Sequence, residues 1–160
     1  MFAALGNRFG PRFSVRRYLL IDLTMRLFFL NIFFFSLSLS PSDGYYIEAD
    51  LRGGNFGDTA QLISPVMTSS ATSCLHFRFK ISPAHAAVLS VCTLSVVNGK
   101  QFLDCSRWTR SSSVGEGWSS GHASLPLAAY PYAVVFHLRR GVRGGVASLD
   151  DVRKTDDDCS

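Results

Sequence analysis

The segment from Cys74 to Ser82, with the sequence CLHFRFKIS, alternates apolar and polar side chains at every position from Leu75 onward. A period of two places the apolar side chains on one side of an extended chain and the polar ones on the other, as in a half-buried β-strand. The apolar members are Leu75, Phe77, Phe79 and Ile81, and the polar members are His76, Arg78 and Lys80. The chain therefore needs a sheet with one apolar face.

Other segments of the chain resemble strands as well. Short runs rich in aromatic and β-branched residues lie between turns of Gly, Pro and Ser, and the turn NGK favours a hairpin. These runs are GYYIEAD (44–50), AVLSVCTLSVV (87–97), QFLDCSRW (101–108), YAVVFHLRR (132–140) and GGVASLDDV (144–152). No convincing long helix and no internal repeat accompanies them. With 160 residues, 47% of them hydrophobic, the chain is long enough for one domain. We expect an all-β antiparallel sandwich or barrel over residues 44–160.

The apolar stretch LFFLNIFFFSLSLS (27–40) precedes that domain. Its apolar part, Leu27 to Leu39, is shorter than the roughly 20 residues that span a bilayer as a helix, and it has the length of a signal-peptide core. A mature start at Asp43 fits this interpretation. An uncleaved signal anchor and a mistranslated intron tract are the alternatives. We expect residues 1–43 to be such a leader, as an apolar helix or a disordered segment.

The net charge of +4 is confined to the start of the chain. The first 26 residues hold five of the 16 basic side chains and one of the 12 acidic ones, which leaves eleven of each in residues 27–160. A neutral body without a basic stripe does not fit the phosphate backbone of nucleic acids, so we exclude a nucleic-acid partner.

The four cysteines are Cys74, Cys92, Cys105 and Cys159. No two of them form a CxxC pair, which excludes the usual zinc-knuckle and thioredoxin spacings. If the chain is exported, three disulfide pairings are open. The expected strands favour Cys92 with Cys105 across a hairpin and Cys74 with Cys159 between an early strand and the tail. Loop closures of this size are each worth about 3 to 4.5 kcal/mol before strain is subtracted. Four free thiols in a cytosolic protein are the alternative.

The segments of the body resemble, in order, the MAM domain found in extracellular parts of meprins, neuropilins and receptor tyrosine phosphatases. They are GYYIEAD, GDTAQLISPV, SCLHFRFKIS, the tryptophans of RWTRSSSVGEGW, YAVVFHL, and GGVASLDDV followed by a cysteine, and together they cover residues 44–160. The residues in register with the family are Leu62, Ser64, Pro65, Cys74, Leu75, Phe77, Trp108, Trp118, Phe136, Leu149, Asp150 and Asp151.

This resemblance implies a jelly-roll-like β-sandwich that works outside the cell in adhesion or assembly. It also implies that Cys74 and Cys159 form the second of the family's two disulfides. The family's opening strand should precede Gly44, so the domain resembles one truncated at its N-terminus, and the loss of an edge strand would leave backbone groups exposed. Two further departures are His137, where the family commonly has a glutamate, and the pair Cys92 and Cys105.

Asp150 and Asp151 form the most prominent polar pair. Strict alternation in SLDDV would point one of the two carboxylates into the sandwich, where it must be hydrogen-bonded, paired or bound to a cation. Some MAM domains bind calcium or sodium near this motif, but two carboxylates are few for a calcium ion, which takes six to eight oxygens. We therefore favour a structural carboxylate and expect no cofactor, with calcium or sodium as the alternative.

No catalytic set is apparent in the sequence. The histidines have no metal-binding spacing, the serines lie in no GxSxG elbow, and RRGVRGGV lacks the lysine and helix of a phosphate loop. We expect a non-catalytic extracellular module, secreted or held at a membrane only through its leader, that binds a protein partner or a second copy of itself. The alternatives are a scaffold fragment of a larger extracellular protease or receptor, a fragment that results from incorrect gene prediction and has no independent function, and a glycan-binding jelly roll. The last would use Trp108 and Trp118, although core packing of both is the favoured interpretation.

Overall fold

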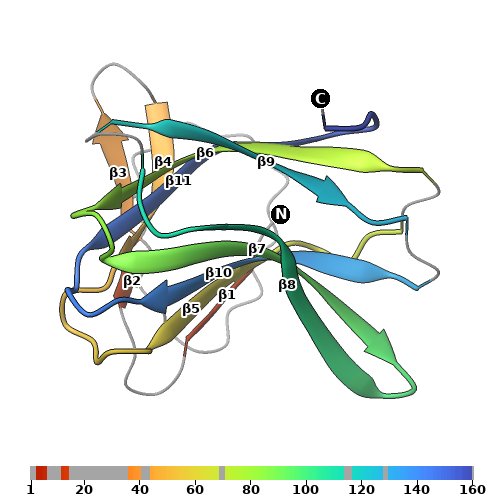
Figure 1. Ribbon diagram of the computed structural model, residues 1–160, viewed down its shortest axis with the longest axis horizontal. Coiled ribbons are helices and arrows are strands. Elements are labelled where there is room, and N and C mark those ends of the chain that lie inside the picture. The colour runs from red at the N-terminus through yellow and green to blue at the C-terminus, as the bar shows by residue number, and fades with distance from the viewer. Residues whose placement is uncertain are drawn as a thin grey trace, which may run out of the picture.

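The chain folds into two antiparallel β-sheets packed face to face, as the computed structural model shows (Figure 1). The structure describes residues 3–6, 12–14, 36–40, 44–68, 71–113, 117–127 and 130–159. All regular elements in these ranges are strands. The prediction of an all-β antiparallel sandwich is therefore confirmed.

The first sheet has five strands in the order β1-β5-β10-β7-β8. They are β1 (Ala3–Gly6), β5 (Thr59–Ile63), β10 (Tyr132–Arg140), β7 (Ala87–Val97) and β8 (Lys100–Arg110). The long hairpin of β7 and β8 turns at Asn98 and Gly99, both with positive φ, as the NGK motif predicts. The end of this hairpin extends beyond the rest of the sandwich (Figure 1).

The second sheet contains β2, β4, β11, β6 and β9 in that order, and β3 pairs with β4 as well. The strands are β2 (Arg12–Ser14), β3 (Ser36–Ser40), β4 (Gly44–Asp50), β11 (Val146–Thr155), β6 (Ser73–Ser82) and β9 (Ser119–Leu125). Each of β9, β10 and β11 lies in the opposite sheet from the strand before it. Every connection there crosses the sandwich, so strands far apart in sequence become neighbours.

The first 43 residues differ from our expectation. A helix or a disordered segment was expected, but residues 3–6, 12–14 and 36–40 are strands. In the described residues the outer sides of β5 and β4, which truncation would leave open, are paired: β1 pairs with β5, while β2 and β3 pair with β4. The apolar residues 27–35 lie outside the described part of the chain, so the signal peptide and the anchor stay predictions. Among the described residues, no helix has the length and apolarity needed to cross a membrane.

The core between the sheets is centred on four aromatic rings. Phe77 makes edge-to-face contacts with Trp108 and Phe136, at centroid distances of 4.9 and 5.1 Å, and Phe79 contacts Trp108 at 4.9 Å. Such edge-to-face pairs add to the stability that burial alone provides. Phe77 and Phe79 come from β6 and the other two from the first sheet, so the cluster joins the two layers.

Two strands of the sandwich within residues 44–160 are missing from the runs that the sequence predicted. In β9 the buried positions hold Ser119, Gly121, Ala123 and Leu125, mostly small residues. A side chain larger than hydrogen at Gly121 has no room, because its Cβ would lie 2.4 Å from Cε2 of Phe77. Buried and exposed residues alternate along β9, but the buried residues are too small and too polar to give a clear hydrophobic pattern in the sequence. The other strand, β5, is only five residues long.

Candidate functional site

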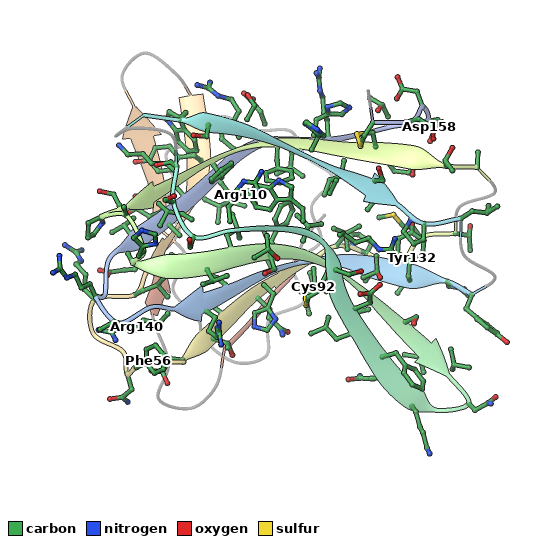
Figure 2. The ribbon with its side chains drawn as sticks, in the orientation of Figure 1. Phe56, Cys92, Arg110, Tyr132, Arg140 and Asp158 are labelled. Atoms are coloured by element: carbon green, nitrogen blue, oxygen red, sulfur yellow. A yellow bond between two sulfur atoms is a disulfide. The ribbon has the colours of Figure 1, made fainter. Side chains whose placement is uncertain are left out.

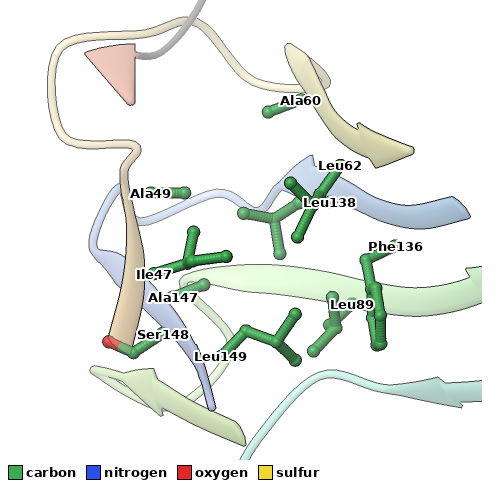
Figure 3. Close-up of a pocket in the computed structure, with 10 residues that line it drawn as sticks. All are labelled: Ile47, Ala49, Ala60, Leu62, Leu89, Phe136, Leu138, Ala147, Ser148 and Leu149. Carbon is green, nitrogen blue, oxygen red and sulfur yellow. The ribbon is translucent and has the colours of Figure 1, made fainter. Parts of the chain in front are cut away.

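The interior of the sandwich offers little room for a ligand. A hollow of about 30 Å³ lies between the sheets, lined almost wholly by apolar side chains (Figure 3). Three residues in register with the MAM family line it: Leu62, Phe136 and Leu149. Pockets for small organic molecules are usually about ten times larger. These three residues pack the core, and the two larger hollows among the described residues lie on the surface.

The outer face of the second sheet carries a groove of about 350 Å³. Register places Glu48 of β4, Ser148 of β11 and Lys80 of β6 side by side across its floor. The Ser148 hydroxyl donates a hydrogen bond to Glu48 Oε2 at 3.3 Å. The groove is completed by Tyr46, Ser82, Trp118 and Val146. Alternation positions these side chains, because the odd-numbered neighbours Ile47 and Ala147 face the core.

Tyr46 and Trp118 meet over this groove. Their rings make an edge-to-face contact at a centroid distance of 5.3 Å. Tyr46 lies on β4 and Trp118 directly precedes β9, and in the sheet β11 and β6 lie between these two strands. The Arg78 guanidinium lies 5.6 Å from the centre of the Trp118 ring, within the range of a cation–π interaction. We call Tyr46, Arg78 and Trp118 the aromatic–arginine cluster. All three side chains are partly exposed.

Asp150 and Asp151 lie differently from our expectation. A β-bulge interrupts the pairing of β11 with β6 between Asp150 and Arg153, and Asp151 has a φ of 50°. The bulge cancels the strict alternation, so neither carboxylate enters the core, and the side chain of Asp151 is 65% exposed. Asp151 lies 3.8 Å from Nη1 of Arg78, and its backbone N–H donates to Asp150 Oδ1. Binding of calcium or sodium at this pair stays the alternative interpretation.

The four cysteines form two disulfides, Cys74–Cys159 and Cys92–Cys105. The first joins the start of β6 to the segment after β11, with a Cα–Cα distance of 5.0 Å. The second links β7 to β8 within the first sheet, where Cys92 is completely buried (Figure 2). Two disulfides fit an oxidising compartment such as the cell exterior.

His137 of β10 lies beside the second disulfide, with Nδ1 4.0 Å from Cys105 Sγ. The ring is half-buried, and among the described residues its Nε2 atom has no hydrogen-bond partner. Burial, with a smaller contribution from the charge of Arg139, lowers the pKa of His137 below its ordinary value of 6.5. The site favours a neutral imidazole.

The lowered pKa of His137 predicts a pH dependence of stability. The unfolded chain binds a proton at this imidazole more readily than the folded chain, so the folded state loses stability as the pH falls through about 6.5. We expect the free energy of unfolding of the wild type to fall more steeply between about pH 7.5 and about pH 5 than that of His137→Gln. Urea unfolding at each pH measures both slopes, and parallel curves would contradict the assignment.

The other motif residues have structural positions. Trp108 packs against the core cluster, with the Arg110 guanidinium 5.6 Å from its ring centre on the solvent side. The Val134 N–H donates to Ser64 Oγ at 2.9 Å, and the Ser64 N–H donates to the Val134 carbonyl at 2.9 Å. The residue after it, Pro65, is exposed. Ser64 thereby extends the pairing of β5 with β10.

A second surface groove, of about 600 Å³, lies on the same sheet. It crosses β9, β6 and the bulged part of β11, and its basic members are His76, Arg78, His122 and Arg153. The two histidines, His76 and His122, are 46 positions apart in the chain and have no metal-binding spacing. Only the antiparallel register of β6 with β9, which sets His76 opposite His122, brings them together.

Sequence comparison was made with known protein families and with curated proteins. A family model described as "MAM domain, meprin/A5/mu" matches residues 36–160. MAM domain-containing protein 2 of Mus musculus is 31% identical over 111 residues, which cover 68% of this chain. Human MAM domain-containing glycosylphosphatidylinositol anchor protein 1 is 29% identical over 73% of the chain, and Neuropilin-1 of Xenopus laevis is 30% identical over 69%. The matches span only 16%, 12% and 12% of these relatives.

Solved structures with similar folds include carbohydrate-binding modules. The CBM22-1 xylan-binding domain from Paenibacillus barcinonensis Xyn10C superposes with a TM-score of 0.53 at 10% identity, covering 74% of this chain and 76% of that one. A carbohydrate-binding module of the β-sandwich superfamily gives a TM-score of 0.57 at 12% identity, covering 75% of this chain and 51% of the other. At such low identity the likeness establishes the jelly-roll sandwich alone.

Proposed function

The chain belongs to the MAM domain family, and on this basis we propose that it is a non-catalytic extracellular module that binds a protein partner through the outer face of its second sheet. The observation that carries the proposal is the aromatic–arginine cluster of Tyr46, Arg78 and Trp118 over the groove. Tyr, Trp and Arg are the residues most enriched among the energetic hot spots of protein interfaces.

The arrangement of the cluster supports a protein partner. Contacts with Tyr46 and Arg78 hold Trp118 in place, so little side-chain freedom remains to be lost on binding. Glu48 and Lys80 on the groove floor provide one charge of each sign for a complementary surface. A second copy of the chain and a different protein are both compatible with this chemistry.

Placement outside the cell is supported by the two disulfides and by the relatives. The name of one relative describes a glycosylphosphatidylinositol anchor protein, and another is a neuropilin. Because the matched part is a small share of each relative, a role as one module of a larger extracellular protease or receptor fits the proposal equally well. In either setting the module contributes binding and no catalysis.

Substitution of Trp118 tests the proposed surface. Full-length protein is displayed on beads and measured for bead-to-bead adhesion and for binding to a panel of extracellular domains. We expect Trp118→Ala to weaken the observed binding at least about tenfold, as truncation of an interface hot spot does. Phe102→Ala is the matched control, since Phe102 is a large exposed ring at the hairpin of the first sheet. Equal binding by all three proteins would exclude this surface.

Glycan binding is the second candidate function. Trp118 beside a polar groove is a ring on which a sugar can stack, whereas Trp108 packs in the core and is poorly placed for such a role. Arg78 and Tyr46 already contact the Trp118 ring, which ranks this candidate below a protein partner. An array of neutral glycans separates the two: signals abolished by Trp118→Ala favour the sugar, and a flat array excludes it.

A further inference from the structure

Three basic side chains form one row across the outer face of the second sheet. The antiparallel register places His76 of β6 directly opposite His122 of β9 and directly opposite Arg153 of β11. Opposite residues of neighbouring strands have Cβ atoms about 5 Å apart, and like charges in such positions repel each other. A row of this kind is unfavourable when charged, unless an anion lies against it.

The surroundings of the row keep it basic. The groove that contains it also holds Arg78, and the acidic residue among its lining residues is Asp151, which lies 3.8 Å from that arginine. Within the part of the chain that the structure describes, no ion pair involves Arg153. Ser120 adds a hydroxyl beside the charges. His122 and Arg153 are exposed and accessible to a large ligand.

The ring of His76 is held in one orientation. Its Nε2 atom lies 3.1 Å from Thr155 Oγ1, and the Thr155 hydroxyl donates to the Cys74 carbonyl at 3.4 Å. With that hydrogen used, the threonine oxygen accepts from His76, so Nε2 carries the hydrogen. In an imidazolium both ring nitrogens carry an N–H, so Nδ1 is the ring nitrogen of His76 that can donate to an oxyanion.

From this geometry we infer that the row of His76, His122 and Arg153 is a binding site for a sulfated polysaccharide. The row crosses three strands, and with neighbouring strands about 4.8 Å apart it spans roughly 10 Å. A single sulfate ion is shorter than this row and leaves part of it uncovered. A chain of sugars with sulfate groups at intervals can do so, and an open surface groove admits such a chain without a closed end.

The site differs from the protein-binding surface proposed above. It lies further along β6, around the bulge of β11, and of the aromatic–arginine cluster it shares only Arg78. Substitutions of His122 and Arg153 therefore test it separately. A wild-type chain that binds heparin but shows no bead adhesion, or the reverse, would show which of the two proposals fails.

The test measures binding of a heparin octasaccharide to the full-length chain at low salt. We expect the double variant His122→Gln/Arg153→Gln to bind the octasaccharide about tenfold more weakly than the wild type. Each single variant should bind it about threefold more weakly, as expected for exposed ion contacts. Affinity should fall as salt is added.

Matched controls separate a built site from general attraction. Lys100→Gln and Arg143→Gln each remove one exposed positive charge away from the groove. The arginines of residues 1–26 are the same in every variant, so their background cancels. We expect each control to stay within about twofold of the wild type. The proposal is overturned if the octasaccharide does not bind, or if the control variants lower its affinity as much as the groove variants do. It is also overturned if inorganic sulfate at equal charge competes for the site as well as unlabelled octasaccharide does.

Discussion

Replacement of both Cys74 and Cys159 by alanine is expected to lower the free energy of unfolding more than removal of the other disulfide, Cys92–Cys105. The Cys74–Cys159 bond closes a loop with a sequence separation of 85 residues. In the loop-entropy model such a closure is worth about 4.5 kcal/mol, because it removes many conformations from the unfolded chain. Most small domains are stable by only about 5 to 15 kcal/mol, so the variant loses between about a third and nearly all of its stability.

The second disulfide provides the matched comparison. Cys92 and Cys105 are separated by 13 residues, for which the same model gives about 3 kcal/mol. Unfolding in urea under non-reducing conditions measures the free energy of unfolding of three proteins. They are the wild type, the double variant Cys74→Ala/Cys159→Ala, and the double variant Cys92→Ala/Cys105→Ala. A larger loss for the short loop would show that local packing around the buried Cys92, and not loop closure, dominates.

Truncation of Phe77 to alanine is expected to cost about 3 to 5 kcal/mol, as removal of a buried aromatic ring usually does. Phe77 is 2% exposed, and its ring contacts the rings of Trp108 and Phe136 from the opposite sheet. The variant loses these contacts and leaves a cavity at the centre of the sandwich. The control is Phe102→Ala, whose ring is 53% exposed and whose loss should change the free energy of unfolding by less than about 0.5 kcal/mol.

A substitution at Gly121 provides a second test of the position of the Phe77 ring. Gly121→Ala alone should destabilise the fold, because the new methyl group would collide with the Phe77 ring. In the Phe77→Ala background the same methyl group enters the empty space, so the second change should cost less than it does in the wild type. A double-mutant cycle measures this coupling. Additive effects would mean that the two residues do not share one site in the folded protein.

The fold could be predicted where a single strand carries its own pattern. In β6 the apolar residues Phe77 and Phe79 alternate with charged ones, and the period of two was enough to predict the strand and its buried face. In β9 the inward positions are small because Phe77 fills the space beneath Gly121. Whether a small residue is buried depends on the strand opposite it, and that information is not local to β9.

The candidate sites were harder to predict, because they arise from register. Tyr46 and Trp118 are 72 positions apart and meet only through the strand order of the second sheet. Likewise, His122 acquires basic neighbours only when β9 is aligned with β6. At Asp151 a local rule failed, since alternation predicted an inward carboxylate and the bulge of β11 turned it outward. Sequence patterns specify the face of a strand more readily than its neighbours.

The bond between Cys74 and Cys159 also determines how the module responds to a pulling force. Six strands, β6 to β11, lie almost entirely between the two cysteines. When the chain is stretched between its ends, tension passes from Cys74 directly to Cys159 and bypasses this loop. Those 85 residues cannot contribute their extended length, which is roughly 280 Å at full stretch. The larger part of the sandwich, with the second groove wholly on it, is therefore shielded from a load that separates the ends of the chain, whereas Tyr46 and Glu48 of the first groove lie outside the loop.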